Sequence, residues 1–127
     1  MLLIFGFMIV EGRGLNPTIS VGADTLHFAA SSYKTSIAFS QFDSVVLRPQ
    51  LHGVKRRLGG MQVGNTYVGQ FEVVPFGRTM LFVNAIRKPY IYFYTRKGVV
   101  VATSKDSVSA ETLARTVRQR IASRVER

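Results

Sequence analysis

The chain contains no cysteine and no tryptophan, and its 127 residues include only two histidines and seven acidic residues. Without cysteine there is no disulfide, no thiolate metal ligand and no cysteine nucleophile. His27 and His52 have no partner at metal-ligand spacing, and the scattered carboxylates include no adjacent pair suited to acid–base catalysis. The sequence also lacks a P-loop, a complete dinucleotide-binding motif and a Gly-x-Ser-x-Gly motif. We therefore expect no enzyme, no cofactor and no metal site.

Negative charge is scarce relative to positive charge. The chain has 17 Lys and Arg against 7 Asp and Glu, a formal net charge of +10. Such an excess favours polyanionic partners, meaning an anionic membrane surface or a nucleic acid. The alternative is a solvated surface that only keeps the protein soluble. Four cations fall in one segment and are expected to form a loop that could hold phosphates: Arg48, Lys55, Arg56 and Arg57.

The N-terminal apolar run MLLIFGFMIV is shorter than the ~20 residues that a membrane-spanning helix needs. It also lacks the basic region and the cleavage site of a signal peptide. Two interpretations of residues 1–14 stay open: the remnant of a transmembrane helix, which we favour slightly, or a buried first strand. Residues 12–17, GRGLNP, then break the chain before a domain of residues 15–127.

Between residues 18 and 104, short alternating runs are separated by turn residues, as in an antiparallel all-β domain. Gly64 and Asn65 lie between two such runs and predict a two-residue hairpin. Turns are also predicted at residues 87–89, which contain Pro89, and at Lys97-Gly98. We expect about seven strands in an antiparallel barrel or sandwich.

After residue 106 the apolar period changes from two to about 3.6, which predicts one C-terminal helix with a buried face. Ser109 is the expected N-cap, and Glu111 is expected in the first turn, where the helix dipole favours a negative charge. The buried face is predicted from residues that recur every four positions: Leu113, Val117, Ile121 and Val125.

The run YIYFYT, residues 90–95, has a tyrosine at every second position. Successive side chains of a strand point to opposite faces. We expect Ile91 and Phe93 in the core and Tyr90, Tyr92 and Tyr94 on an outer or partly covered face, where tyrosine suits protein contacts. The basic pairs on either side also suit single-stranded nucleic acid. A strand and two turns explain every residue, so nucleic acid is the less favoured partner.

The order of these elements resembles the bacterial PH-domain (pleckstrin-homology-like) family. The resemblance covers residues 18–121 and is carried by FDSVVLRPQLHGVKRRLGGMQVGNTYVGQFEV and YIYFYTRKGVVVATSKD. The positions that match are a proline, an arginine, a glycine and a Gly-x-Phe: Pro49, Arg57, Gly59 or Gly60, and Gly69-Gln70-Phe71.

The resemblance implies a PH-like barrel closed by a helix, often preceded by a membrane-spanning segment, able to form symmetric oligomers and mostly without assigned activity. The phosphoinositide site of eukaryotic relatives needs basic residues in the loop after the first strand. Here that loop is Gly22-Ala23-Asp24, which has no Lys or Arg, so we do not expect inositol phosphates to bind.

We therefore expect a non-catalytic interaction module that associates with a protein or with itself, through an exposed strand edge or the tyrosine face. It would be tethered to a bacterial cell membrane on the cytoplasmic side, which the excess of Lys and Arg favours. It would be cytoplasmic if the N-terminal segment belongs to the fold. The alternative function is the binding of anionic lipid headgroups or nucleic acid through the basic loop. No small-molecule substrate is expected.

Overall fold

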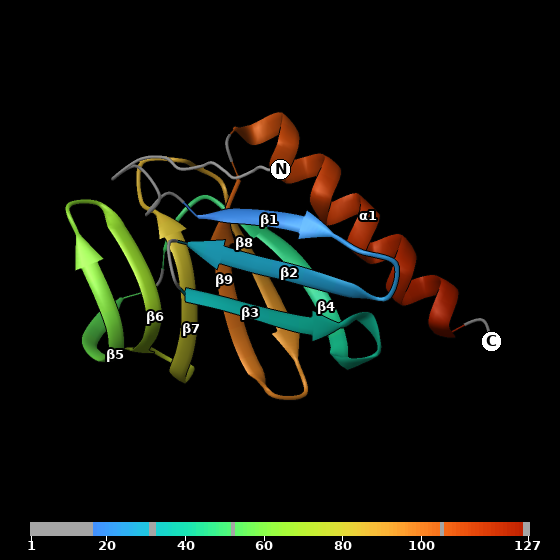
Figure 1. The fold of residues 1–127 in the computed structure, drawn as a ribbon. Coiled ribbons are helices and arrows are strands. Elements are labelled where there is room, and N and C mark those ends of the chain that lie inside the picture. The colour runs from blue at the N-terminus through green and yellow to red at the C-terminus, as the bar shows by residue number, and fades with distance from the viewer. Residues whose placement is uncertain (1–16, 31–32, 52, 105, 126–127) are drawn as a thin grey trace, which may run out of the picture.

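The structure, a computed structural model, describes residues 17–30, 33–51, 53–104 and 106–125. The predicted N-terminal segment and His52 lie outside the described residues. The described chain forms a two-layered β structure with a short 3-10 helix, η4 (Phe39–Gln41), and a C-terminal helix, α1 (Ser107–Val125) (Figure 1). The strands are β1 (Thr18–Val21), β2 (Thr25–Ala30), β3 (Tyr33–Ala38), β4 (Phe42–Arg48), β5 (Val54–Val63), β6 (Thr66–Val73), β7 (Gly77–Asn84), β8 (Tyr90–Thr95) and β9 (Gly98–Thr103).

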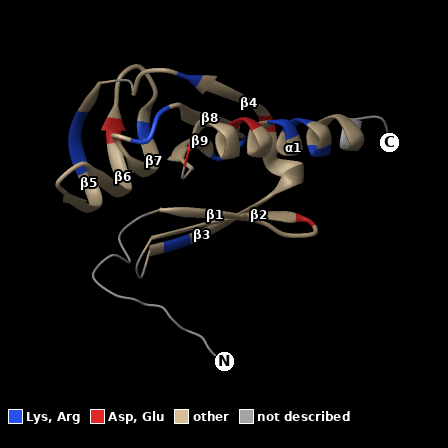
Figure 2. Cartoon of the chain, turned by 90° about the horizontal axis from the view of Figure 1, so that it is seen from above, with Lys and Arg blue, Asp and Glu red and all other residues tan. Residues whose placement is uncertain are grey.

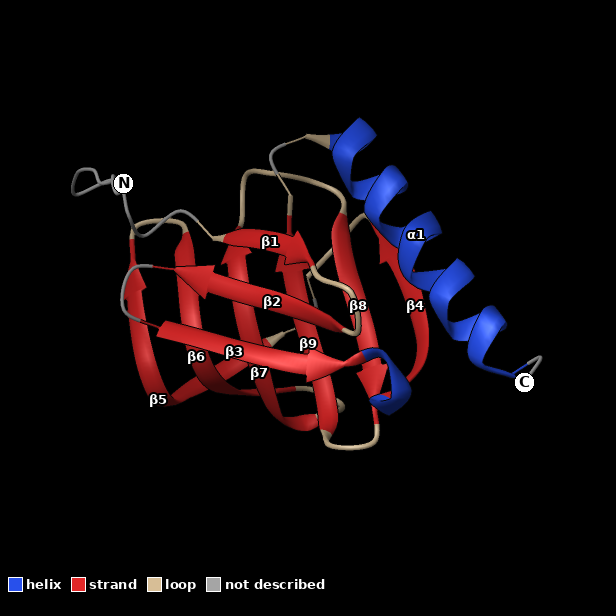
Figure 3. Ribbon diagram, turned by 45° about the vertical axis from the view of Figure 1, so that its right-hand side comes forward, coloured by secondary structure: helices blue, strands red, loops and turns tan. Residues whose placement is uncertain are grey.

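The strands divide into two sheets. The small sheet has the order β1-β2-β3, and the large sheet has the order β4-β8-β9-β7-β6-β5. Strands of the small sheet cross those of the large sheet at a steep angle (Figure 3), an arrangement typical of orthogonal sheet packing. Because β4 and β5 are opposite edges of the large sheet and do not pair, the described strands form no closed barrel.

The expectation of a mainly β fold with one C-terminal helix is confirmed. The structure has nine strands rather than about seven, and the hairpin predicted at Gly64-Asn65 joins β5 to β6. The antiparallel order was wrong at one pair, since β7 and β9 are parallel. The reason is topological: the chain passes from β7 to β8, which lies one position beyond β9, and then returns to insert β9 between them.

Phenylalanine rings fill the space between the two sheets. Phe28 of β2 stacks on Phe82 of β7 at 5.6 Å and meets Phe93 of β8 edge-on at 5.3 Å. Phe42 meets the same Phe93 ring edge-on at 5.7 Å. Ile91 and Phe93 are both 0% exposed and belong to this cluster, so their predicted core positions are confirmed.

The opposite face of the large sheet carries a second apolar cluster, and here the expectation for the tyrosines was wrong. Tyr92 is 0% exposed and Tyr90 is 4% exposed, and both pack with Leu81 and Val101. Only Tyr94 is partly exposed. Tyr90 and Tyr92 are therefore core residues of the second cluster and do not form an outer surface.

The cover over this second cluster comes from the connection between β4 and β5. Residues 49–53 lead from one edge of the large sheet to the other, and Leu51 packs against the second cluster. The Tyr92 hydroxyl donates to the Gln50 carbonyl at 3.1 Å. This cover was not predictable from the alternation within β8, because alternation shows which residues share a face but not what lies over that face.

The shortness of this connection requires the large sheet to curl. Six peptide steps from Arg48 to Val54 span at most roughly 21 Å. The edges of a flat six-stranded sheet are about 24 Å apart. The sheet therefore bends toward its tyrosine side, and two register irregularities in β5, between Val54 and Arg56 and between Arg57 and Gly59, help β5 to bend.

Helix α1 packs mainly against β4, with further contacts to η4 and β8 (Figure 3). Of the predicted stripe, Val117 is buried, Leu113 and Ile121 are partly buried against the same core, and the side chain of Val125 lies outside the described part. Ala110 and Ala114, beside the stripe, are buried as well. The expected N-cap was wrong: the helix begins at Ser107, and the Ser109 N–H donates to the Asp106 carboxylate at 2.7 Å. Consequently Glu111 does not lie in the first turn, which contains no acidic residue.

Candidate functional site

The four cations predicted to share one loop lie in two separate places. Arg48 is at the end of β4, while Lys55, Arg56 and Arg57 are consecutive residues of β5 at the opposite edge of the sheet. The predicted loop is therefore largely a strand. Its members cannot converge on one phosphate as a single flexible loop would.

Arg48 belongs to the cover of the second apolar cluster, which contains Tyr90 and Tyr92 and which we call the tyrosine cluster. Its register partner is Tyr90. Its guanidinium lies over the Tyr92 ring, 5.4 Å from the ring centroid, and its Nη2 donates to the Tyr94 hydroxyl at 3.2 Å. A cation over an aromatic face is attracted by the ring quadrupole, so Arg48 acts as a partner of the tyrosines.

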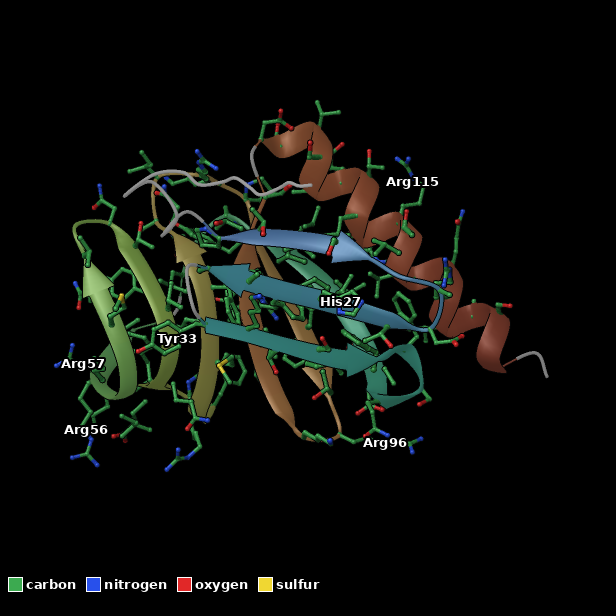
Figure 4. The ribbon with its side chains drawn as sticks, in the orientation of Figure 1. His27, Tyr33, Arg56, Arg57, Arg96 and Arg115 are labelled. Atoms are coloured by element: carbon green, nitrogen blue, oxygen red, sulfur yellow. The ribbon has the colours of Figure 1, made fainter. Side chains whose placement is uncertain are left out.

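The remaining three cations define the candidate site, which we call the β5 edge: the exposed residues of strand β5 along the end of the large sheet. β5 pairs with β6 on one side, and no described strand pairs with its other side. Figure 2 shows a continuous stretch of basic residues on this outermost strand. In Figure 4 the labelled Arg56 and Arg57 side chains project away from the sheet at this end.

Glu72 on β6 partly neutralises the β5 edge. Its carboxylate accepts from Arg56 Nε at 2.7 Å and lies 3.9 Å from Lys55 Nζ. The cations remain well exposed, with 72% of the Arg56 side chain and 60% of the Lys55 side chain accessible. Arg78 stands opposite Glu72 in the register of β7 and donates to Gln70. A single carboxylate thus faces several cations, so the local charge stays positive.

Apolar side chains are also exposed along β5. Leu58 is 38% exposed and Val63 is 54% exposed. The strand therefore offers three features together: free backbone groups, a run of cations and aliphatic side chains. Free backbone groups at a sheet edge are a template for pairing with another extended chain.

The other edge of the large sheet is not open in this way. α1 packs along β4, and Arg118 Nε of the helix donates to the Val45 carbonyl at 3.3 Å. A second chain could not add to β4 without displacing the helix.

Sequence reasoning placed only the end of β5, next to the Gly64-Asn65 turn, in a strand. It assigned Lys55, Arg56 and Arg57 to a loop and so missed this site. Three consecutive charges and the pair Gly59-Gly60 disrupt the alternation that marks a strand. One signal could have found it, because the hairpin at Gly64-Asn65 requires a strand of matching length before the turn.

A histidine and a serine form a polar pair on the outer face of the small sheet. His27 Nδ1 and Ser36 Oγ are 2.7 Å apart, and both side chains are exposed. No carboxylate among the described residues bonds to this pair, and the described residues contain no group of three metal-ligating side chains. An exposed histidine–serine pair on an open sheet face lacks the walls that a catalytic site needs to exclude water.

The phenol of Tyr90 has a raised pKa. Burial raises the pKa of Tyr90 above its ordinary value, and the neighbouring Tyr67 raises it further. The Tyr90 hydroxyl donates to the Ala85 carbonyl at 2.5 Å. Tyr90 therefore stabilises the tyrosine cluster through packing and this hydrogen bond.

Within the part of the chain that the structure describes, no helix is long and apolar enough to cross a membrane. Comparison with protein-family models, with curated proteins and with solved structures found no match to this chain.

Proposed function

We propose that this protein is a non-catalytic interaction module that pairs strand β5 with an extended, acidic segment of a partner protein. The observation that carries the proposal is that β5 is a ten-residue strand with an unpaired edge and three consecutive exposed cations. Main-chain hydrogen bonds would supply affinity, and alternate side chains would supply specificity.

The charge of the β5 edge selects the partner. Two copies of this chain paired through β5 would bring two positively charged strands together, and like charges across an interface are unfavourable. An acidic strand would instead place its carboxylates beside Arg57 and Lys55. Leu58 and Val63 would contact aliphatic side chains of the same segment, which gives an apolar contribution that salt does not screen.

The PH-like assignment belongs to the same proposal. Two orthogonal sheets followed by a terminal helix support it, and the parallel β7–β9 pair departs from the expected antiparallel order. Fold alone would not define the partner. The proposed function therefore depends on the β5 edge and not on whether the fold is PH-like.

The test uses a fluorescent, capped peptide of alternating Thr and Glu, equal in length to β5, and measures its dissociation constant by anisotropy. We expect saturable binding by the wild-type chain. Arg57→Glu should raise the dissociation constant roughly fivefold, or about 1 kcal/mol. Arg96→Glu is the matched control, because Arg96 is equally basic and exposed but lies at the β8–β9 turn (Figure 4). Equal weakening by both variants would contradict a site on β5.

Polyanion binding is the second candidate function, and the run of exposed cations on β5 favours it. A peptide in which Pro replaces Thr keeps every carboxylate but has fewer backbone donors and cannot adopt a paired strand. If the partner binds by strand pairing, the Pro peptide should bind much more weakly than the Thr peptide. Equal binding would mean that charge alone is recognised and would replace the first proposal with the second.

A further inference from the structure

A groove of about 510 Å³ lies between β1 and the first half of α1. The helix contributes one stripe of its surface, Ser109, Thr112, Leu113 and Thr116, at the i, i+3, i+4 and i+7 spacing of a single helix face. The strand contributes Ile19 and Val21. Other parts of the lining are Pro17, Thr18, Arg87, Ser104 and Val108.

The groove exists because α1 rests on the large sheet. The helix packs mainly on β4, η4 and β8. Arg120 in its second half donates to the Ala23 carbonyl at the β1–β2 turn, while the first half of the helix faces β1 across this gap. Aliphatic side chains are left uncovered as a result: Val21 is 41% exposed and Val108 is 71% exposed. Contiguous exposed apolar surface of this kind usually marks a place where another group binds.

We propose that the groove is occupied by the chain's own N-terminal apolar segment, Met1–Val10. Six residues, 11–16, separate this segment from Pro17, which itself lines the groove. The seven peptide steps from Val10 to Pro17 can span up to roughly 25 Å. The groove face of the helix, from Ser109 to Thr116, is about 10 Å long. The segment is therefore tethered within reach of the whole groove.

The tether favours this occupant over others. Covalent attachment through six residues gives the segment an effective concentration of about a millimolar at the groove, whereas a second copy would have to compete from bulk solution. The composition is complementary as well, because nine of the ten residues are apolar and none is charged. Charged residues begin at Glu11, within the linker. The inference is independent of the proposed role of β5, which lies elsewhere on the fold.

The absence of cysteine allows a direct test in the full chain. Single cysteines are placed in turn at Leu3, Phe5, Phe7 and Ile9, each together with Thr112→Cys, and the rate of disulfide formation is measured at high dilution. The matched control replaces Thr112→Cys with Glu111→Cys. Glu111 is the adjacent helix residue, equally distant along the chain and exposed, but it does not line the groove.

We expect at least one Thr112 pair to form an intramolecular disulfide about tenfold faster than its Glu111 counterpart. Val21→Asp, which places a charge in the groove at a position outside the core clusters, should remove that advantage, whereas Val21→Ala should retain it. Equal rates for the Thr112 and Glu111 pairs would overturn the proposal. Covalent dimers as the main product would overturn it in favour of a second copy.

A last arm repeats the oxidation with vesicles of mixed zwitterionic and anionic phospholipid. A segment that belongs to the fold keeps its fast Thr112 disulfide in the presence of vesicles. Loss of the disulfide, with the chain recovered on the vesicles, would overturn the proposal in favour of membrane insertion.

Discussion

One edge of the large sheet, β4, is covered, and the other edge, β5, is exposed. At β4 the C-terminal helix covers the edge, and Arg118 bonds to the backbone carbonyl of Val45. At β5 no described strand pairs with the edge, and the strand presents Lys55, Arg56 and Arg57 to solvent. Consecutive cations are a common protection of an exposed edge against aggregation. They also make the edge selective for an acidic strand, so protection and recognition share the same residues.

Both faces of the central strands β7, β8 and β9 of this sheet are core. The phenylalanine cluster lies under the small sheet, and the tyrosine cluster lies under the β4–β5 connection. With the central strands buried on both faces, the edge strands of this sheet are left for contact with a partner. Binding is therefore expected at the exposed β5 edge and not at the buried Tyr90 and Tyr92.

The largest loss of stability should come from disrupting the contact between α1 and the large sheet at β4. Val117→Asp places a carboxylate in the 0%-exposed contact between α1 and the sheet. A buried charge without a partner is strongly unfavourable, so we expect a loss of more than about 4 kcal/mol in the free energy of unfolding. Urea denaturation followed by circular dichroism measures it. Ser123→Asp, on the exposed part of the helix, should change stability little; a folded Val117→Asp chain would show that α1 is not part of the core.

The next effect tests whether the tyrosine face is closed. Tyr92→Ala removes a fully buried ring and its hydrogen bond to Gln50, and we expect a loss of about 3–5 kcal/mol, comparable with Phe93→Ala. Thermal or urea unfolding of both variants provides the comparison. If Tyr92→Ala kept wild-type stability while Phe93→Ala did not, the tyrosine face would be an exposed surface after all.

A smaller effect concerns how β5 is held on β6. A Cβ on Gly60 would lie 2.2 Å from the Val68 carbonyl oxygen, and Gly60 has φ of 132°. We expect Gly60→Ala to cost roughly 2–4 kcal/mol. The adjacent Gly59 has no atom within 4 Å of its Cβ position, so Gly59→Ala should be nearly neutral. Similar losses for the two variants in urea unfolding would argue against the close approach of β5 and β6.

The smallest effect concerns Glu72 and the affinity of the β5 edge for the acidic peptide. Glu72→Gln removes the carboxylate that pairs with Lys55 and Arg56. With both cations released, we expect the acidic peptide to bind about twofold more tightly, a change of roughly 0.4 kcal/mol. The anisotropy assay detects it, and the gain should disappear at high salt. Weaker binding by Glu72→Gln would mean that Glu72 positions the cations for the partner.

Much of the fold was predictable from local patterns. The hairpin at Gly64-Asn65, the bounds of β8 and the buried stripe of α1 all follow from turn chemistry or side-chain period. The candidate site was harder to predict from the sequence. Burial of Tyr92 depends on a connection from the far edge of the sheet, and β5 has an irregular register that hides its alternation. Both are tertiary features, which single-strand patterns do not encode.

The most direct test of the open-edge account is amide hydrogen exchange of the full chain with and without the Thr–Glu peptide. Strand pairing should slow exchange at alternate residues of β5, those whose N–H groups point away from β6, and leave β1, β3 and β4 unchanged. This pattern is specific because only hydrogen bonding at the β5 edge produces it. Peptide binding with unchanged β5 exchange, or with protection on another strand, would contradict the account.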